Sequence, residues 1–65
     1  MNRGNAMHGT IIIIDYFLQF VERGTAADEA LALAKTRLYA TYRERMKREE
    51  YLATIELLER IAANM

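Results

Sequence analysis

The side chains that could do chemistry are few, and their order in the chain suits no catalytic arrangement. The sequence has no serine and no cysteine, so its candidate nucleophiles are threonines, lysines and tyrosines. Its one histidine, His8, falls in the N-terminal segment. Nucleophilic catalysis needs a base held beside the nucleophile, and no such pair is indicated. We therefore expect no catalytic residues and no enzyme.

Acidic residues could do acid–base work or bind a metal if they came close together in space. Glu56 and Glu59 are one helical turn apart, and Asp15 and Glu22 are two turns apart. The Glu-x-x-His pair of di-iron helical bundles does not occur, and neither does a glycine-rich phosphate loop. One histidine without thiolates cannot surround a metal. We expect solvated carboxylates, no metal and no cofactor.

A third group of residues has the chemistry of nucleic-acid binding. Basic side chains pair with phosphates, and tyrosine rings stack on bases. Both kinds occur in the segment 37–51, as Arg37, Arg43, Arg45, Lys47 and Arg48 with Tyr39, Tyr42 and Tyr51. Against this, residues 43–50 hold four basic and three acidic residues, a net charge of only +1. Glu44 and Arg48 also form an i,i+4 pair in the order that favours a solvated helix.

The composition predicts a chain that needs a partner. With 65 residues there is room for one domain, and a chain this short buries only about 60% of the surface that its unfolded form exposes. Disulfides are excluded because there is no cysteine, yet 52% of the residues are hydrophobic. A second copy of the chain is the simplest cover for the surplus apolar surface. The formal net charge of zero favours neither nucleic acid nor anionic membrane.

The first nine residues are expected to be a flexible tail. Met7 is an alternative start of the chain, and the sequence leaves open whether residues 1–6 are native. Arg3 precedes the apolar run 11–14, as in a signal peptide, but Asp15 and Gln19 interrupt that run. The run is also far shorter than the ~20 apolar residues that cross a bilayer. We expect a single domain over residues 10–65 and, without cysteine, a cytoplasmic protein.

Residues 11–23 are predicted to form the first helix. Thr10 suits its N-cap and Gly24 the position just after its end. Four isoleucines could form a strand, but the polar residues at 15, 19 and 22 have the spacing of one helical face. Thr25 is expected to cap a second helix through the backbone N–H of Asp28, which makes the connection tight and produces a helical hairpin.

The apolar stripe of this second helix changes sides along its length. At about 100° per residue, the residues on the side of Leu38 are Ala27, Leu31, Ala34 and Tyr42. A different side carries Tyr51, Ile55, Leu58 and Ala62. The drift of a heptad pattern, about 20° per heptad, is too slow to explain the change.

Two arrangements fit this change of side. In one, residues 26–62 form a single rod whose second half must meet another subunit. In the other, the chain turns within residues 43–50 and folds as three helices. Because residues 43–50 contain no glycine, proline, asparagine or serine, we expect the continuous helix.

The predicted fold is therefore all-α: a helical hairpin that assembles into a homo-oligomeric bundle, most simply a dimer. The residues expected at an oligomer or partner interface are Leu33, Tyr51, Ile55, Leu58, Ile61 and Ala62. As a function we expect a non-catalytic interaction module or small regulator that also binds another protein. Nucleic-acid binding through the segment 37–51 is the alternative. Membrane binding through residues 11–21 ranks last, because the polar face there is acidic.

Overall fold

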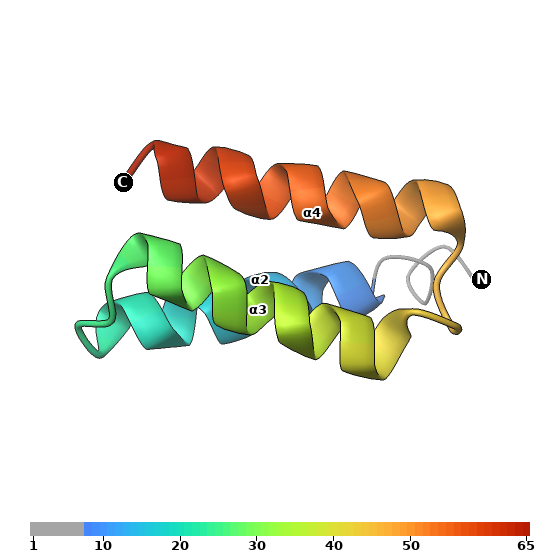
Figure 1. Cartoon of the computed structure of the whole chain (residues 1–65), viewed down its shortest axis with the longest axis horizontal. Helices are drawn as coiled ribbons and strands as arrows, with labels where there is room; N and C mark the ends of the chain where they lie inside the picture. The colour runs from blue at the N-terminus through green and yellow to red at the C-terminus, as the bar shows by residue number, and fades with distance from the viewer. Residues whose placement is uncertain (1–7) are drawn as a thin grey trace.

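The computed structural model describes residues 8–65, which contain three helices and no strand. Helix α2 spans His8–Glu22, α3 spans Ala27–Tyr42 and α4 spans Arg48–Ala63. Consecutive helices run in opposite directions, so α4 is parallel to α2 (Figure 1). The three rods lie side by side in a bundle of 36 × 19 × 18 Å. The all-α prediction is confirmed. The predicted tail lies mostly outside the described residues, which begin at His8 inside the first helix.

The turn between α2 and α3 follows from one glycine, as the sequence predicts. Gly24 has a φ of +97°, in the left-handed region that favours glycine. Its N–H donates to the Val21 carbonyl at 3.0 Å, and the Thr25 N–H donates to the Phe20 carbonyl at 3.0 Å. These two bonds satisfy carbonyl groups at the end of α2 and make a Schellman motif. The helices on either side are therefore antiparallel neighbours.

The two predicted threonine caps are wrong. Thr10 is not an N-cap: it lies inside α2, is buried, and its hydroxyl group is 2.8 Å from that of Thr54 on α4. The N-cap of α3 is Ala26, which makes no side-chain cap, and the Asp28 carboxylate accepts a hydrogen bond from the N–H of Glu29 instead. Thr10 serves contact between helices, which a local capping rule cannot predict.

The continuous helix over residues 26–62 is also wrong, because the chain turns between Tyr42 and Arg48. The N–H groups of Arg45 and Met46 both donate to the Tyr42 carbonyl, and Lys47 then adopts an extended conformation, with φ −65° and ψ 151°. Outside glycine, the described residues have no positive φ. This turn therefore needs none of the residues that mark turns in a sequence, since most residue types adopt these angles.

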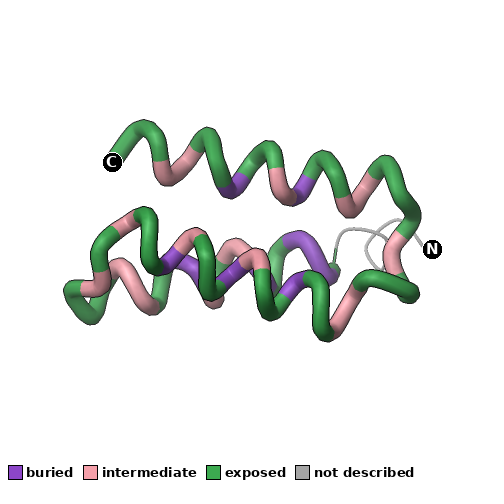
Figure 2. Tube along the Cα trace, viewed as in Figure 1, coloured by how far each residue is buried: buried purple, intermediate pink, exposed green. Residues whose placement is uncertain are grey.

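Folding back at this turn brings both apolar stripes of the second half of the chain onto one core. The fully buried apolar residues are Ile13 and Phe17 of α2, Ala30, Ala34 and Leu38 of α3, and Leu58 of α4. On each helix they lie on the side turned toward the other two (Figure 2). Ala30 and Ala34 of α3 are four residues apart, so they lie on the same buried side of that helix. Burying Leu58 offsets the helical hydrogen bonds lost at the turn, because packing supplies most helix stability in proteins.

Candidate functional site

The residues predicted to lie at an interface are, with one exception, turned toward the interior of the bundle. Leu58 is fully buried by its own chain. Tyr51, Ile55, Ile61 and Ala62 are half-buried and pack against the core, while Leu33 is exposed on α3. A continuous rod would place these residues beyond the reach of the first helix and leave them exposed. In the bundle α4 is a separate helix that lies against α2 and α3, so the chain itself covers most of them.

Helix α2 carries a different apolar stripe that its neighbours leave partly uncovered. Ile11, Ile14, Leu18 and Val21 are spaced by three, four and three residues, so they share one side of the helix. Ile11 is 60% exposed and Leu18 37% exposed, and the other two are half-buried. The neighbouring helices thus leave one side of α2 partly open.

Contacts to the two neighbouring helices show which way this stripe points. On one flank of α2, the Thr10 hydroxyl meets Thr54 of α4. On the opposite flank, the ring of Tyr16 lies 5.4 Å from the guanidinium carbon of Arg37 on α3. By helical spacing the stripe lies next to Thr10 and away from Tyr16. It therefore borders α4.

Helix α4 presents apolar residues on the edge that borders α2. Leu57, 37% exposed, and the half-buried Ile61 lie on the side of Thr54, opposite Glu59. The Glu59 carboxylate meets the Lys35 ammonium group of α3 at 2.7 Å, so that opposite side borders α3. Together the two helices form one surface, which we call the α2/α4 face: Ile11, Ile14, Leu18, Val21, Leu57 and Ile61.

Charged residues border the α2/α4 face on both of its long edges. Asp15 and Glu22 lie on the outer edge of α2, and Arg60 lies on the outer edge of α4 together with Glu49 and Glu56. Asp15 accepts a hydrogen bond from Gln19 at 2.8 Å. Among residues 8–65 the ion pairs are Lys35–Glu59 and Arg43–Glu44, so none of these five edge charges takes part in an ion pair.

The basic residues predicted to contact nucleic acid do not form one group. Arg37 lies over Tyr16, away from the others. Arg43 stacks on Tyr39 with its guanidinium carbon 4.6 Å from the ring centre, and donates a hydrogen bond of 2.7 Å to the tyrosine hydroxyl. Tyr39 is 53% exposed, so its ring lies at the surface. Arg45, Lys47 and Arg48 are exposed in the turn before α4 and at its start.

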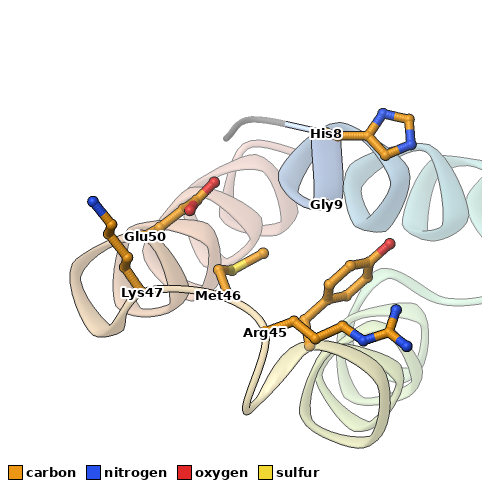
Figure 3. Close-up of a pocket in the computed structure, with 7 residues that line it drawn as sticks. His8, Gly9, Arg45, Met46, Lys47 and Glu50 are labelled. Atoms are coloured by element: carbon orange, nitrogen blue, oxygen red, sulfur yellow. The ribbon is translucent and has the colours of Figure 1, made fainter. Parts of the chain in front are cut away.

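A cleft of about 350 Å³ lies where this turn meets the start of α2 (Figure 3). Its lining residues are His8, Gly9, Tyr42, Arg45, Met46, Lys47 and Glu50. One carboxylate oxygen of Glu50, Oε2, is buried without a hydrogen-bond partner. Charges of both signs line an open cleft that holds no nucleophile paired with a base. Within the described chain, no three acidic or histidine side chains are grouped as a metal would require.

Gly9 explains how closely the start of α2 approaches this turn. A Cβ atom at Gly9 would lie 2.9 Å from the Met46 methyl carbon and 3.0 Å from the Tyr42 ring. A larger residue would therefore push α2 away from the end of α3. The contact depends on tertiary packing, and Gly9, which the sequence places in the N-terminal segment 1–9, lies within α2.

Comparison with known proteins adds no assignment: no family model, no curated protein and no solved structure matches the chain. No helix within residues 8–65 combines the length and the apolar character that crossing a membrane requires.

Proposed function

We propose that this protein is a small, non-catalytic interaction module that works as a homo-oligomer and, through the assembled bundle, binds another protein. The observation that carries the proposal is the α2/α4 face. Isolated exposed leucines are normal on protein surfaces, whereas apolar residues gathered on one face are typical of contact sites. We expect such a module to act in the cytoplasm, in agreement with a chain that uses no cysteine.

The small size of the bundle supports the same proposal. Three helices of 15 or 16 residues enclose few fully buried side chains, and the largest are Phe17, Ile13, Leu38, Leu58 and Thr54. A core this small stabilises a fold weakly, and association is one of the ways in which small domains gain stability.

Multi-angle light scattering of the purified chain at about 5–50 µM would test the proposal, because this range lies above a dissociation constant of about 1 µM and a dimer of that affinity would be the main species. We expect a mass of at least twice the 7.5 kDa of one chain. Helicity should be measured on the same samples, so that an unfolded chain is not mistaken for a folded monomer. A fully helical protein with the mass of a single chain across this range would refute the proposal.

Nucleic-acid binding is the second candidate, and one contact favours it. The stacked pair of Tyr39 and Arg43 offers an exposed ring and a guanidinium group side by side, close to Arg45, Lys47 and Arg48. Such a pair suits stacking on a base together with pairing to a phosphate. Retardation of single-stranded DNA or RNA that weakens steeply with salt would support this candidate. If neutralising the four basic residues of 43–48 left the retardation unchanged, the candidate would be refuted.

A further inference from the structure

We infer that the α2/α4 face is the docking site for a basic amphipathic helix of another protein. Such a helix would lay its apolar stripe on the face and its lysine or arginine side chains along the two edges. This inference rests on the proposed function, of which it specifies the binding of another protein, and it leaves self-association to the other sides of the bundle. The distribution of charge over the bundle selects this partner.

Charge is segregated in the bundle, although the chain as a whole has a formal net charge of zero. By helical spacing, four of the nine acidic residues lie on the edges of the α2/α4 face: Asp15, Glu22, Glu49 and Glu56. Among the described basic residues only Arg60 lies on these edges, and the others lie on α3, in the two turns or at the first position of α4. Four negative charges and one positive charge give the edges a formal net charge of −3.

The edge charges are available to a partner. All five side chains belong to exposed residues, and none takes part in an ion pair among residues 8–65. A basic side chain of a partner therefore meets these carboxylates without displacing a cation of the same chain. Because complementary charges around a contact speed the encounter and fix its orientation, the edges favour a partner with basic residues on both flanks of its apolar stripe.

The same edges disfavour a second copy of the chain on this face. The α2 edge carries two negative charges, and the α4 edge carries two negative charges and one positive charge. Whichever edges two copies bring together, both have a net negative charge, and like charges in contact oppose association. An anionic membrane surface is disfavoured for the same reason.

The arrangement of the two helices suits a helical partner. Helices α2 and α4 are parallel neighbours (Figure 1), and they lie at the same level where the hydroxyl oxygens of Thr10 and Thr54 are 2.8 Å apart. The apolar stripe from Ile11 to Val21 is about 15 Å long, at a rise of about 1.5 Å per residue, so a helix of about three turns covers it. Laid along both helices, the partner makes the fourth helix of a bundle. Its apolar residues then follow the i, i+3, i+4, i+7 spacing of helices that bind to apolar surfaces.

The first test compares two synthetic peptides of about 18 residues, because isolated helices shorter than about 15 residues are marginal in water. Both have the same leucine stripe at the i, i+3, i+4, i+7 spacing, flanked by lysine in one peptide and by glutamate in the other. We expect the full chain to bind the lysine peptide at least about tenfold more tightly than the glutamate peptide. That preference should shrink when NaCl is raised from about 50 to about 500 mM, because salt screens exposed charges. Isothermal titration calorimetry measures both affinities.

A second test locates the site with a leucine substitution. Leu18→Gln removes an apolar contact from the centre of the face and adds no charge. Leu52→Gln is the matched control, because Leu52 is 50% exposed on the side of α4 opposite Thr54. We expect Leu18→Gln to weaken binding of the lysine peptide at least about tenfold and Leu52→Gln less than about threefold. Circular dichroism verifies that each variant is helical.

A third test reverses the charge of the α2 edge. The double variant Asp15→Lys, Glu22→Lys should bind the lysine peptide about tenfold more weakly and should gain affinity for the glutamate peptide. The gain identifies the edge itself, because a damaged helix would lose affinity for both peptides. The control Glu29→Lys, Glu44→Lys changes the net charge equally on α3 and in the second turn, and it should alter either affinity less than about threefold.

The outcomes separate this inference from the proposed function. Equal affinity for the two peptides, or equal losses in the two double charge variants, would overturn the inference, because attraction would then not arise at this face. A wild-type homo-oligomer that Leu18→Gln dissociates without peptide would place a second copy on the face, which overturns the inference while self-association stands. A helical monomer that binds the lysine peptide in the expected pattern would refute self-association and support the inference.

Discussion

Leu58→Ala tests the fold more directly than any other substitution. In a continuous rod Leu58 would point away from the first helix, and its removal would affect only contacts with another subunit. In the folded bundle Leu58 is fully buried, and it is the one large apolar residue that α4 contributes to the buried core. The rod therefore predicts no loss of stability for a single chain, whereas the bundle predicts a large one.

The expected loss follows from burial. Truncating a buried leucine to alanine costs about 2–5 kcal/mol, which includes the cavity left behind. At about 0.05–0.15 kcal/mol per residue, a chain of this length has a total stability of only about 3–10 kcal/mol. Leu58→Ala should thus lower the melting temperature by at least about 10 °C, and in the weaker part of this range it unfolds the protein.

Urea unfolding followed by circular dichroism at 222 nm measures the effect. It should be repeated at several protein concentrations, because association adds its own stabilisation. Leu52→Ala is the control: its side chain is half exposed on the same helix and should cost less than about 1 kcal/mol. Equal losses for the two variants, or a Leu58→Ala protein that loses mass but keeps its stability per chain, would refute the packing of α4 described above.

Three further predictions concern single contacts. Gly24→Ala should cost about 1 kcal/mol in urea unfolding, because φ at +97° is strained for any side chain although nothing would touch the new Cβ; an unchanged midpoint would contradict the Schellman turn. Thr10→Val and Thr54→Val should each cost about 1–2 kcal/mol, and Thr54→Val more than Thr10→Val because the Thr54 hydroxyl also donates to the Glu50 carbonyl at 2.8 Å. The double variant should cost less than their sum, since both remove the bond between the two hydroxyl groups; strict additivity in the cycle would contradict that bond. Lys35→Met should lower the free energy of unfolding by less than about 1 kcal/mol, because its ion pair with Glu59 is solvent-exposed. A larger loss in the same assay would contradict the expectation that an exposed pair contributes little.

The hairpin was predictable because its signals are local. Polar residues at 15, 19 and 22 identify the first helix, and the run from Thr25 onward is rich in good helix formers. Gly24 marks the turn because few other residues adopt its backbone angles at low cost. These features depend on neighbours within one or two turns, which a single sequence displays.

The second turn was missed because its signal is not local. Tyr42 and Lys47 bound a connection made entirely from ordinary backbone angles, so residue types there say little. What favours the break is the burial of Leu58 against helices that lie far away in sequence. The interface prediction relied on a continuous rod, whereas in the bundle Leu58 is buried and Tyr51, Ile55, Ile61 and Ala62 pack against the core.

The sequence predicts only part of the α2/α4 face. The narrow polar stripe of the first helix indicates that most of its circumference should be covered, and in the bundle Ile11 and Leu18 are still partly exposed. Which side stays open depends on where α4 lies. No periodicity within residues 11–21 contains that information.

By itself the sequence determined the helical class and the first turn, because both depend on residue type and short-range spacing. Only the tertiary structure decided where the second half of the chain turns, which leucines are buried and which face of α2 lies open. Burial is a property of pairs of segments distant along the chain, and its free energy outweighs the local preference of residues 43–47 to continue a helix.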